Sequence, residues 1–169
     1  MDSNYKQRLK DISTFIFDVD GVLTDGTLLI MPDGEQLRRM NIKDGYALQL
    51  AVKKGYRVAI ISGKKNEGVI KRLHGLGIKD LYMGVQDKEE ALDEYLHLCD
   101  LATEKTLYMG DDIPDYGVMR RVGIAACPAD ACHEIKSISH HVSSYRGGEG
   151  CVRDVIEQVL RVQGQWEIA

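Results

Sequence analysis

Short apolar runs alternate along the chain with segments whose apolar residues recur at helical spacing. Buried strands are expected at Ser13–Val19, Arg57–Ser62, Asp80–Gly84, Thr106–Gly110, Gly123–Cys127 and His140–Ser144. Helices are expected between them, at Asp44–Lys54, Glu67–His74, Asp87–Cys99, Pro114–Val122 and Gly150–Val162. Regular alternation of strands and helices predicts an α/β fold, with a mostly parallel sheet flanked by helices.

One segment interrupts this alternation. Residues 28–42 contain two short strand-like pieces around Pro32-Asp33-Gly34, which is a turn sequence. We therefore expect a β-hairpin over about residues 27–42, projecting beside the end of the first strand. We find no linker, internal repeat or low-complexity tract, so we expect one domain over residues 1–169.

Composition narrows the class of protein. The 169 residues carry a net charge of −4 and no basic field suited to nucleic acid. No apolar run approaches the ~18 residues of a membrane span, and the start MDSNYKQRLKD lacks the apolar core of a signal peptide. The four cysteines form no CxxC pair, so we expect reduced thiols and a cytoplasmic protein. We interpret His140-His141 as a strand edge rather than a metal site.

Polar residues follow the expected strands at the edge where parallel sheets bind their ligands. Asp18 and Asp20 follow the first strand, and Ser62-Gly63-Lys64 follows the second. Asp87-Lys88 opens the helix after the third strand, and Gly110-Asp111-Asp112-Ile113-Pro114-Asp115 follows the fourth. These side chains would meet if the first and fourth strands are neighbours.

So many carboxylates at one edge require a counter-ion. Oxygen ligands suit Mg²⁺, whereas the cysteine and histidine ligands of zinc sites are absent from these segments. Capping is the alternative for Asp112, because a helix is expected to open at Pro114. An EF-hand is excluded, since Val22, Leu23 and Leu29 occupy positions that need a ligand, a glycine and a glutamate.

Three weaker signals each allow two interpretations. Ser62 could hold a phosphate oxygen or lie in a strand-exit turn; a P-loop is excluded because Val58 replaces its first glycine. Lys88 is expected in the first turn of a helix, where a positive charge is unfavourable because of the helix dipole. Either a bound anion offsets this cost, or Lys88 is exposed and pairs with acidic residues on its own helix. The loop Arg146–Gly150 could cradle a phosphate or be a flexible connection. We place Asp25 in the turn leading to the hairpin.

Taken together, these segments resemble the haloacid dehalogenase (HAD) superfamily of phosphohydrolases. The matching pieces are Asp18-Val19-Asp20-Gly21-Val22, Ser62, Lys88 and Gly110-Asp111-Asp112-x-x-Asp115, in that order. The resemblance spans essentially the whole chain and implies a Rossmann-like, HAD-type fold. It also implies that a cap domain is absent, because only the hairpin follows Asp20 and no room for an insertion exists between Gly84 and Lys88.

The chain is similar, within that superfamily, to the 3-deoxy-D-manno-octulosonate (KDO) 8-phosphate phosphatases of lipopolysaccharide sugar synthesis. The similar pieces are Asn41–Tyr46, Ser62-Gly63-Lys64 and Arg146-Gly147-Gly148-x-Gly150. This resemblance implies Mg²⁺-dependent hydrolysis of a phosphorylated sugar acid. It also implies a homotetramer in which the hairpin and neighbouring subunits cover the site.

The resemblance also implies roles for individual residues. Asp18 would be the nucleophile that forms an aspartyl-phosphate, and Asp20 the general acid and base. Asp18, the backbone carbonyl of Asp20, and Asp111 would hold Mg²⁺, while Ser62 and Lys88 would hold the phosphoryl oxygens. Asp115 would orient Lys88, and Asp112 would support the metal shell. Candidate sugar contacts are Asn41, Asp44, Gly45, Lys64 and Arg72.

Two residues depart from the family pattern. The family often has threonine at the position of Ser62 and arginine at that of Lys64; serine keeps the hydroxyl, whereas lysine keeps the charge without the bidentate fork. Related phosphatases of nonulosonic acid 9-phosphates can carry an acidic residue at the second position, so a cation there favours the octulosonate. A nonulosonic acid phosphatase, a non-catalytic oligomerisation module and a receiver-type signalling domain are the alternatives.

Overall fold

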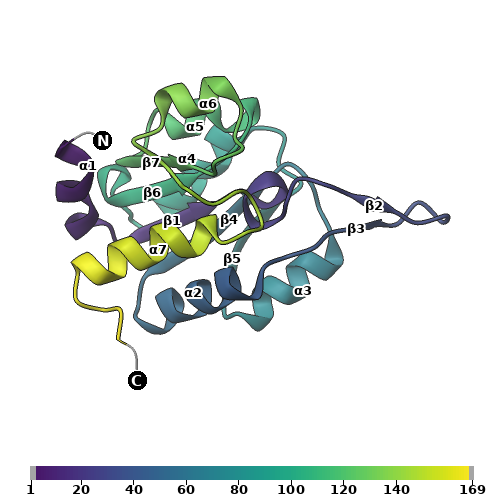
Figure 1. Ribbon diagram of the computed structural model, residues 1–169, viewed down its shortest axis with the longest axis horizontal. Coiled ribbons are helices and arrows are strands. Elements are labelled where there is room, and N and C mark those ends of the chain that lie inside the picture. The colour runs from purple at the N-terminus through teal and green to yellow at the C-terminus, as the bar shows by residue number, and fades with distance from the viewer. Residues whose placement is uncertain (1–2, 168–169) are drawn as a thin grey trace.

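A six-stranded parallel sheet forms the centre of the fold in the computed structural model, which describes residues 3–167 (Figure 1). Its order is β5-β4-β1-β6-β7-β8, which confirms the six expected strands and the neighbouring positions of the first and fourth. Residues 1–2 and 168–169 of the expected domain lie outside the described part. The bounds are β1 Thr14–Phe17, β4 Arg57–Ser62, β5 Asp80–Met83, β6 Thr106–Met109, β7 Ile124–Cys127 and β8 His141–Val142.

Helices cover both faces of this sheet. They are α1 Ser3–Arg8, α2 Ile42–Lys53, α3 Glu67–Gly75, α4 Lys88–Leu98, α5 Tyr116–Met119, α6 His133–Ile138 and α7 Cys151–Val162. Four of the five expected helices are α2, α3, α4 and α7. The expected helix Pro114–Val122 is shorter, because the chain first makes a 3₁₀ turn over Ile113–Asp115 and then forms α5. Two short helices, α1 and α6, were not expected.

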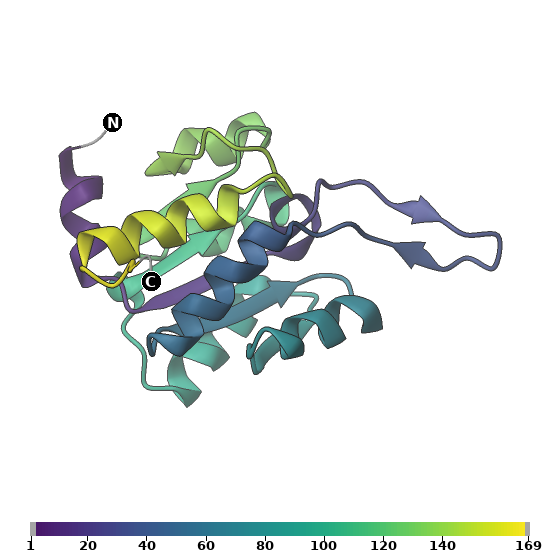
Figure 2. The ribbon, with the colours of Figure 1, turned by 60° about the horizontal axis from the view of Figure 1, so that its bottom comes forward.

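Alternation along the strands sends apolar side chains into two separate cores. In β1, Phe15 and Phe17 pack under α1, α2, α3 and α7, while Ile16 faces the core under α4, α5 and α6. All three side chains are fully buried, and the burial of each stabilises the fold by roughly 1.5–3 kcal/mol relative to exposure to water. In Figures 1 and 2, α2 and α7 lie side by side on one face. The fold is therefore a three-layer HAD-type arrangement, as expected.

The order in which the chain adds strands to the sheet reverses at β1, and this reversal positions the site. From β1 the chain passes through α2 to β4 on one side, and later from β5 through α4 back to β6 on the other. The loops after β1 and β6 therefore meet, and the N–H of Asp18 donates to the carbonyl of Met109 at 3.1 Å. Ligands of open parallel sheets bind at such a reversal.

The expected hairpin is present and extends away from the sheet (Figures 1 and 2). Strands β2 (Leu29–Ile30) and β3 (Gln36–Leu37) pair antiparallel, and an isolated bridge between Thr24 and Met40 closes its base. Both strands are exposed. Between β1 and α2 the hairpin is the only insertion, as expected for a chain without a cap domain. None of the helices within residues 3–167 has the length and apolar character needed to cross a membrane.

Candidate active site

Asp18 leaves the end of β1 and enters a tight turn over Val19–Leu23. Its Oδ1 accepts a hydrogen bond from the N–H of Val19 at 2.7 Å, and its side chain is almost fully buried. Gly21 takes φ of +89°, a backbone conformation that favours glycine, and its N–H donates to the Thr24 hydroxyl at 3.2 Å. The turn thus places the two aspartates of the DxDG sequence on a short, internally bonded loop.

Lys88 supplies a buried positive charge to this loop. Its Nζ lies 3.1 Å from Oδ1 of Asp18 and 2.7 Å from Oδ1 of Asp115, which lies far along the chain. Asp87 caps α4, accepting from the N–H groups of Glu89 and Glu90, and so fixes the helix that carries the lysine. The interpretation of Lys88 as a surface residue paired on its own helix is wrong, because the side chain is 7% exposed and pairs across the site.

Asp115 is held from three directions. Besides Lys88, the Tyr108 hydroxyl donates to its Oδ1 at 2.6 Å, and the N–H of Asp111 donates to its Oδ2 at 3.1 Å. Tyr108 lies on β6 and is completely buried, and burial beside Asp115 raises the pKa of its hydroxyl well above the usual value. Asp115 is thus fixed as the partner that orients Lys88 toward Asp18.

A cation fits between the carboxylates. One oxygen each of Asp18, Asp111 and Asp115 lies within 4.8 Å of the others. Within the described residues, Oδ1 of Asp111 is buried and has no hydrogen-bond partner, which leaves a ligand atom unsatisfied. Three carboxylates face the single charge of Lys88, and an all-oxygen donor set suits a hard ion such as Mg²⁺. The residues present therefore fit the expected metal.

The titration of these groups reflects the same excess of negative charge. Burial, together with the charge of Asp115, raises the pKa of Asp18 to about 7 although Lys88 acts against it. Burial and the charges of Asp18, Asp115 and Asp112 raise the pKa of Asp111 to about 8. Burial would lower the pKa of Lys88, but Asp115 and Asp18 outweigh it and raise that pKa. A bound cation would relieve the repulsion that these shifts report.

Two glycines leave room for the carboxylates. A Cβ on Gly21 would overlap the carboxylate of Asp111, and a Cβ on Gly110 would overlap the side chain of Asp115. The loop expected at Arg146–Gly150 packs from the other side, where the N–H of Gly148 donates to the carbonyl of Val22 at 2.9 Å. That loop supports the Val19–Leu23 turn directly in this structure.

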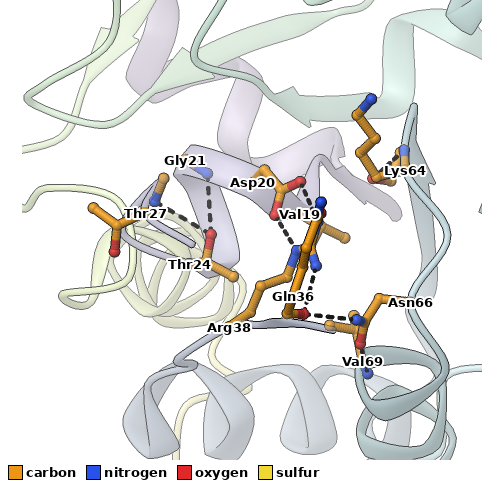
Figure 3. Close-up of polar contacts among 12 residues, drawn as sticks. Val19, Asp20, Gly21, Thr24, Thr27, Gln36, Arg38, Lys64, Asn66 and Val69 are labelled. Carbon is orange, nitrogen blue, oxygen red and sulfur yellow. Dashed lines mark hydrogen bonds and ion pairs between the residues drawn. The ribbon is translucent and has the colours of Figure 1, made fainter. Parts of the chain in front are cut away.

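Asp20 has a cation of its own. Both of its carboxylate oxygens accept from Arg38, at 2.6 Å from Nε and 3.2 Å from Nη2 (Figure 3). Asp18 pairs with Lys88 instead, so the two neighbouring carboxylates are neutralised by different residues. Pairing with different cations reduces the repulsion between these two closely spaced aspartates.

Ser62 and Lys64 lie at the end of β4, next to β1. Ser62 is 2% exposed, and its hydroxyl accepts from the N–H of Lys64 at 3.4 Å. Lys64 itself is exposed, and with Lys88 it lines a depression of about 360 Å³. The two lysines therefore lie at one opening, with Lys88 at its buried end.

The expected sugar contacts occupy different surroundings. Arg72 is exposed on α3, and one of its Nη atoms approaches Gly45 so closely that a Cβ there would lie 2.7 Å away. The side-chain oxygen of Asn41 caps α2 by accepting from Lys43 and Asp44.

Asp44 differs most from its expected role. It is 1% exposed, and its Oδ1 accepts from the N–H of Arg153 at 2.8 Å, in the first turn of α7. Burial raises its pKa to about 6, although hydrogen bonds from the start of α7 oppose the shift. A sugar cannot reach a carboxylate enclosed between two packed helices, so we reassign Asp44 from substrate contact to support of α7.

Two further acidic residues, Asp112 and Asp25, bond within local turns. Asp112 is exposed and accepts from the N–H of Ile113 at 2.9 Å, which makes it the cap of the 3₁₀ turn. Its charge still acts on the nearby Asp111. Asp25 binds Thr27 and Arg39 at the base of the hairpin, in the turn where we expected it.

Sequence reasoning missed Tyr108 and Arg38. Tyr108 belongs to an apolar strand, where its hydroxyl gives no signal in the hydrophobic pattern. Arg38 and Arg39 are adjacent in the returning arm of the hairpin. The local sequence does not indicate that Arg38 is buried and Arg39 exposed. A register-based pairing of the hairpin could have placed the two side chains on opposite sides.

The chain is similar to known proteins over nearly its whole length. A family model described as haloacid dehalogenase-like hydrolase matches residues 80–155. The 3-deoxy-D-manno-octulosonate 8-phosphate phosphatase of Yersinia pestis is 37% identical over 161 residues, covering 95% of this chain and 86% of that protein. The crystal structure of a Yersinia pestis 3-deoxy-D-manno-octulosonate 8-phosphate phosphatase superposes with a TM-score of 0.94 at 36% identity, covering 96% of this chain and 88% of that chain.

A second solved structure contains ligands. The Moraxella catarrhalis phosphatase of the same name, in complex with a magnesium ion, a phosphate ion and a KDO molecule, matches with a TM-score of 0.93 at 30% identity. That match covers 97% of this chain and 94% of the other.

Proposed function

This chain belongs to the 3-deoxy-D-manno-octulosonate 8-phosphate phosphatase family of HAD-like hydrolases, and we propose that it hydrolyses that sugar-acid phosphate with Mg²⁺. The observation that carries the proposal is the contact of Lys88 with both Asp18 and Asp115 beside the unsatisfied oxygen of Asp111. This arrangement supports the assignment of a nucleophile, a phosphate-binding cation and metal ligands at one edge of the sheet.

We assign the chemistry to two aspartates. Asp18 attacks the phosphorus, the bond from phosphorus to the sugar oxygen breaks, and Asp20 gives a proton to the departing oxygen. Water then attacks the aspartyl-phosphate, Asp20 takes the proton from that water, and Asp18 is released. Lys88, 3.1 Å from Oδ1 of Asp18, gives the buried nucleophile a cationic partner.

The remaining residues bind and orient. We assign Ser62 and Lys88 to the phosphoryl oxygens, where negative charge is spread as the bond to the leaving group breaks. Asp115, fixed by Tyr108, holds Lys88 in place. Asp18, Asp111 and the carbonyl of Asp20 would hold Mg²⁺, and Asp112 would support that shell. The bound metal would neutralise the charge of the phosphate as it approaches Asp18.

We retain Lys64 and Arg72 as proposed contacts for the sugar acid. Both are exposed cations, which suits recognition of a carboxylate. Lys64 lines the depression that contains Lys88, and Arg72 lines a second depression together with Arg38. Asn41 and Gly45 remain weaker proposals because one caps α2 and the other packs against Arg72.

Replacing Asp18 by asparagine tests the proposed function. Phosphate release from 3-deoxy-D-manno-octulosonate 8-phosphate should fall to background in Asp18→Asn, because the amide is a poor nucleophile, while the circular dichroism spectrum stays unchanged. Asp25→Asn is the matched control from the same loop and should keep normal turnover. EDTA should stop the wild-type reaction and Mg²⁺ restore it. Normal turnover by Asp18→Asn would disprove the nucleophile assignment.

A side-by-side assay tests the choice of substrate. We expect higher kcat/KM for the octulosonate 8-phosphate than for a nonulosonic acid 9-phosphate, because the cation Lys64 stands where phosphatases of nonulosonic acid phosphates can carry an acidic residue. The reverse order would establish the alternative substrate. Inactivity of the wild-type protein toward both, with Mg²⁺ present, would favour the non-catalytic oligomerisation module.

We further propose that residues 1–169 act as one catalytic domain of a cytoplasmic homotetramer. The hairpin supports the assembly, since Leu29 and Ile30 are 63% and 59% exposed there. The four free cysteines support a reducing compartment. Leu29→Asp should reduce the mass measured by light scattering to that of a smaller species. Leu98→Asp, at a similarly exposed leucine on α4, should leave that mass unchanged.

A further inference from the structure

Arg38 is a buried cation on an otherwise exposed hairpin. Its side chain is 4% exposed, whereas that of the adjacent Arg39 is 86% exposed. Backbone pairing brackets both residues, because β3 ends at Leu37 and Met40 bridges to Thr24. Successive side chains on an extended strand point to opposite sides, so Arg38 points to the sheet edge and Arg39 to solvent and Asp25.

The guanidinium holds Asp20 with two parallel bonds. Nε lies 2.6 Å from Oδ1 and Nη2 lies 3.2 Å from Oδ2, so one bond is short and the other long. This bidentate geometry specifies the orientation of the carboxylate plane as well as its position. Asp20 is partly exposed at 32%, so without Arg38 its side chain would be free to change rotamer in solvent.

The hairpin strand that carries this arginine is tied to the body of the protein at Gln36. Its Nη1 donates to the carbonyl of Gln36 at 3.2 Å, and that carbonyl also accepts from Nδ2 of Asn66 at 3.1 Å. Asn66 in turn caps α3 by accepting from the N–H of Val69. Figure 3 shows these contacts running from Asn66 through Gln36 and Arg38 to Asp20. Asn66 thus links the hairpin to α3, and Arg38 links the hairpin to the proposed acid.

We propose that Arg38 is a positioning residue that fixes Asp20 for proton transfer to the leaving oxygen; this inference rests on the proposed phosphatase function. A guanidinium only donates hydrogen bonds, so the transferable proton of Asp20 must point away from it, and the oxygen that carries this proton is the weaker acceptor. The short bond from Nε of Arg38 to Oδ1 of Asp20 therefore holds the carboxyl in place. The longer bond from Nη2 to Oδ2 weakens when Oδ2 carries the proton. Asp20 gives this proton to the sugar oxygen as the phosphorus–oxygen bond breaks.

Three phosphate esters with Mg²⁺ test this role. The octulosonate 8-phosphate and a neutral aldose phosphate have alkoxide leaving groups that need a proton, whereas p-nitrophenyl phosphate has a leaving group that does not. In Arg38→Met, kcat/KM for both sugar esters should fall on the order of 10- to 100-fold, while that for p-nitrophenyl phosphate changes by less than about threefold. Arg38→Lys should be intermediate, because it keeps the charge without the fork.

Arg39→Met is the matched control and should retain the wild-type values for all three esters. The ratio between esters is measured within one variant, so it does not depend on the fraction of folded protein. An equal loss for all three esters would overturn the positioning role in favour of a purely structural one. Loss confined to the sugar-acid ester would overturn it in favour of binding to the substrate carboxylate. Absence of wild-type turnover of every ester would instead refute the proposed function.

Discussion

At the scale of single residues, the candidate site depends on space as much as on charge. Gly21 combines φ of +89° with contact against the carboxylate of Asp111. No other residue type satisfies both conditions, because a side chain there would be strained and would enter the volume that Asp111 occupies. The carboxylate of Asp111, in the loop after the neighbouring strand β6, thus explains why glycine stands in the DxDG sequence.

We expect Gly21→Ala to lose Mg²⁺ affinity out of proportion to its loss of stability. The strained backbone should cost roughly 1–2 kcal/mol, and the new methyl group should displace the Asp111 carboxylate. Gly55→Ala is the control, since Gly55 has φ of +87° and an added methyl group there would meet no atom within 4 Å. The midpoint temperature of thermal unfolding should fall by a similar amount in both variants. The Mg²⁺ affinity measured by titration should fall in Gly21→Ala alone. Equal Mg²⁺ affinity in the two variants would contradict the steric argument.

At the scale of elements, α2 and α7 support each other through a buried carboxylate. Gly150 precedes α7 and offers no side chain to cap it, so Asp44 of α2 accepts from the N–H of Arg153. Negative charge is favourable at a helix N-terminus, but burial raises the pKa of this carboxyl to about 6. The contact therefore holds the loop Arg146–Gly150, and through it the Val19–Leu23 turn.

Replacing Asp44 by alanine separates its two possible roles. We expect Asp44→Ala to lower the free energy of unfolding by about 1–3 kcal/mol, because buried N–H groups of α7 lose their acceptor. KM for the sugar-acid phosphate should stay near the wild-type value. Denaturant unfolding and steady-state kinetics on the same preparation provide the two measurements. A raised KM with unchanged stability would restore Asp44 to the substrate contacts.

At the scale of the whole molecule, the acidic edge opposes folding when no cation is bound. The pKa values of Asp18 and Asp111 are raised to about 7 and about 8, so the folded chain binds these protons more tightly than the unfolded chain. Stability from such groups is present at low pH and is lost as pH rises through the folded pKa. Mg²⁺ binds the ionised form and should reverse that loss.

We therefore expect the free energy of unfolding in EDTA to decrease between about pH 4 and about pH 8 more steeply in the wild-type protein than in Asp111→Asn. The difference across this range should reach at least ~1.4 kcal/mol, the equivalent of one pKa unit. Saturating Mg²⁺ should flatten the wild-type curve. Urea unfolding across this pH range measures the effect, and parallel curves for the two proteins in EDTA would disprove it.

The sequence by itself determined the strands, most helices, the hairpin and the acidic residues after β1 and β6. Those features depend on alternation, helical spacing and turn residues, which are local properties of the chain. The family resemblance had already implied that Asp115 orients Lys88. Only the tertiary structure showed that Lys88 also pairs with Asp18 and that Arg38 pairs with Asp20. It also decided that Asp44 is buried. Strand order and the return path of the hairpin bring together residues that are distant in sequence. Local sequence patterns therefore do not predict these pairings.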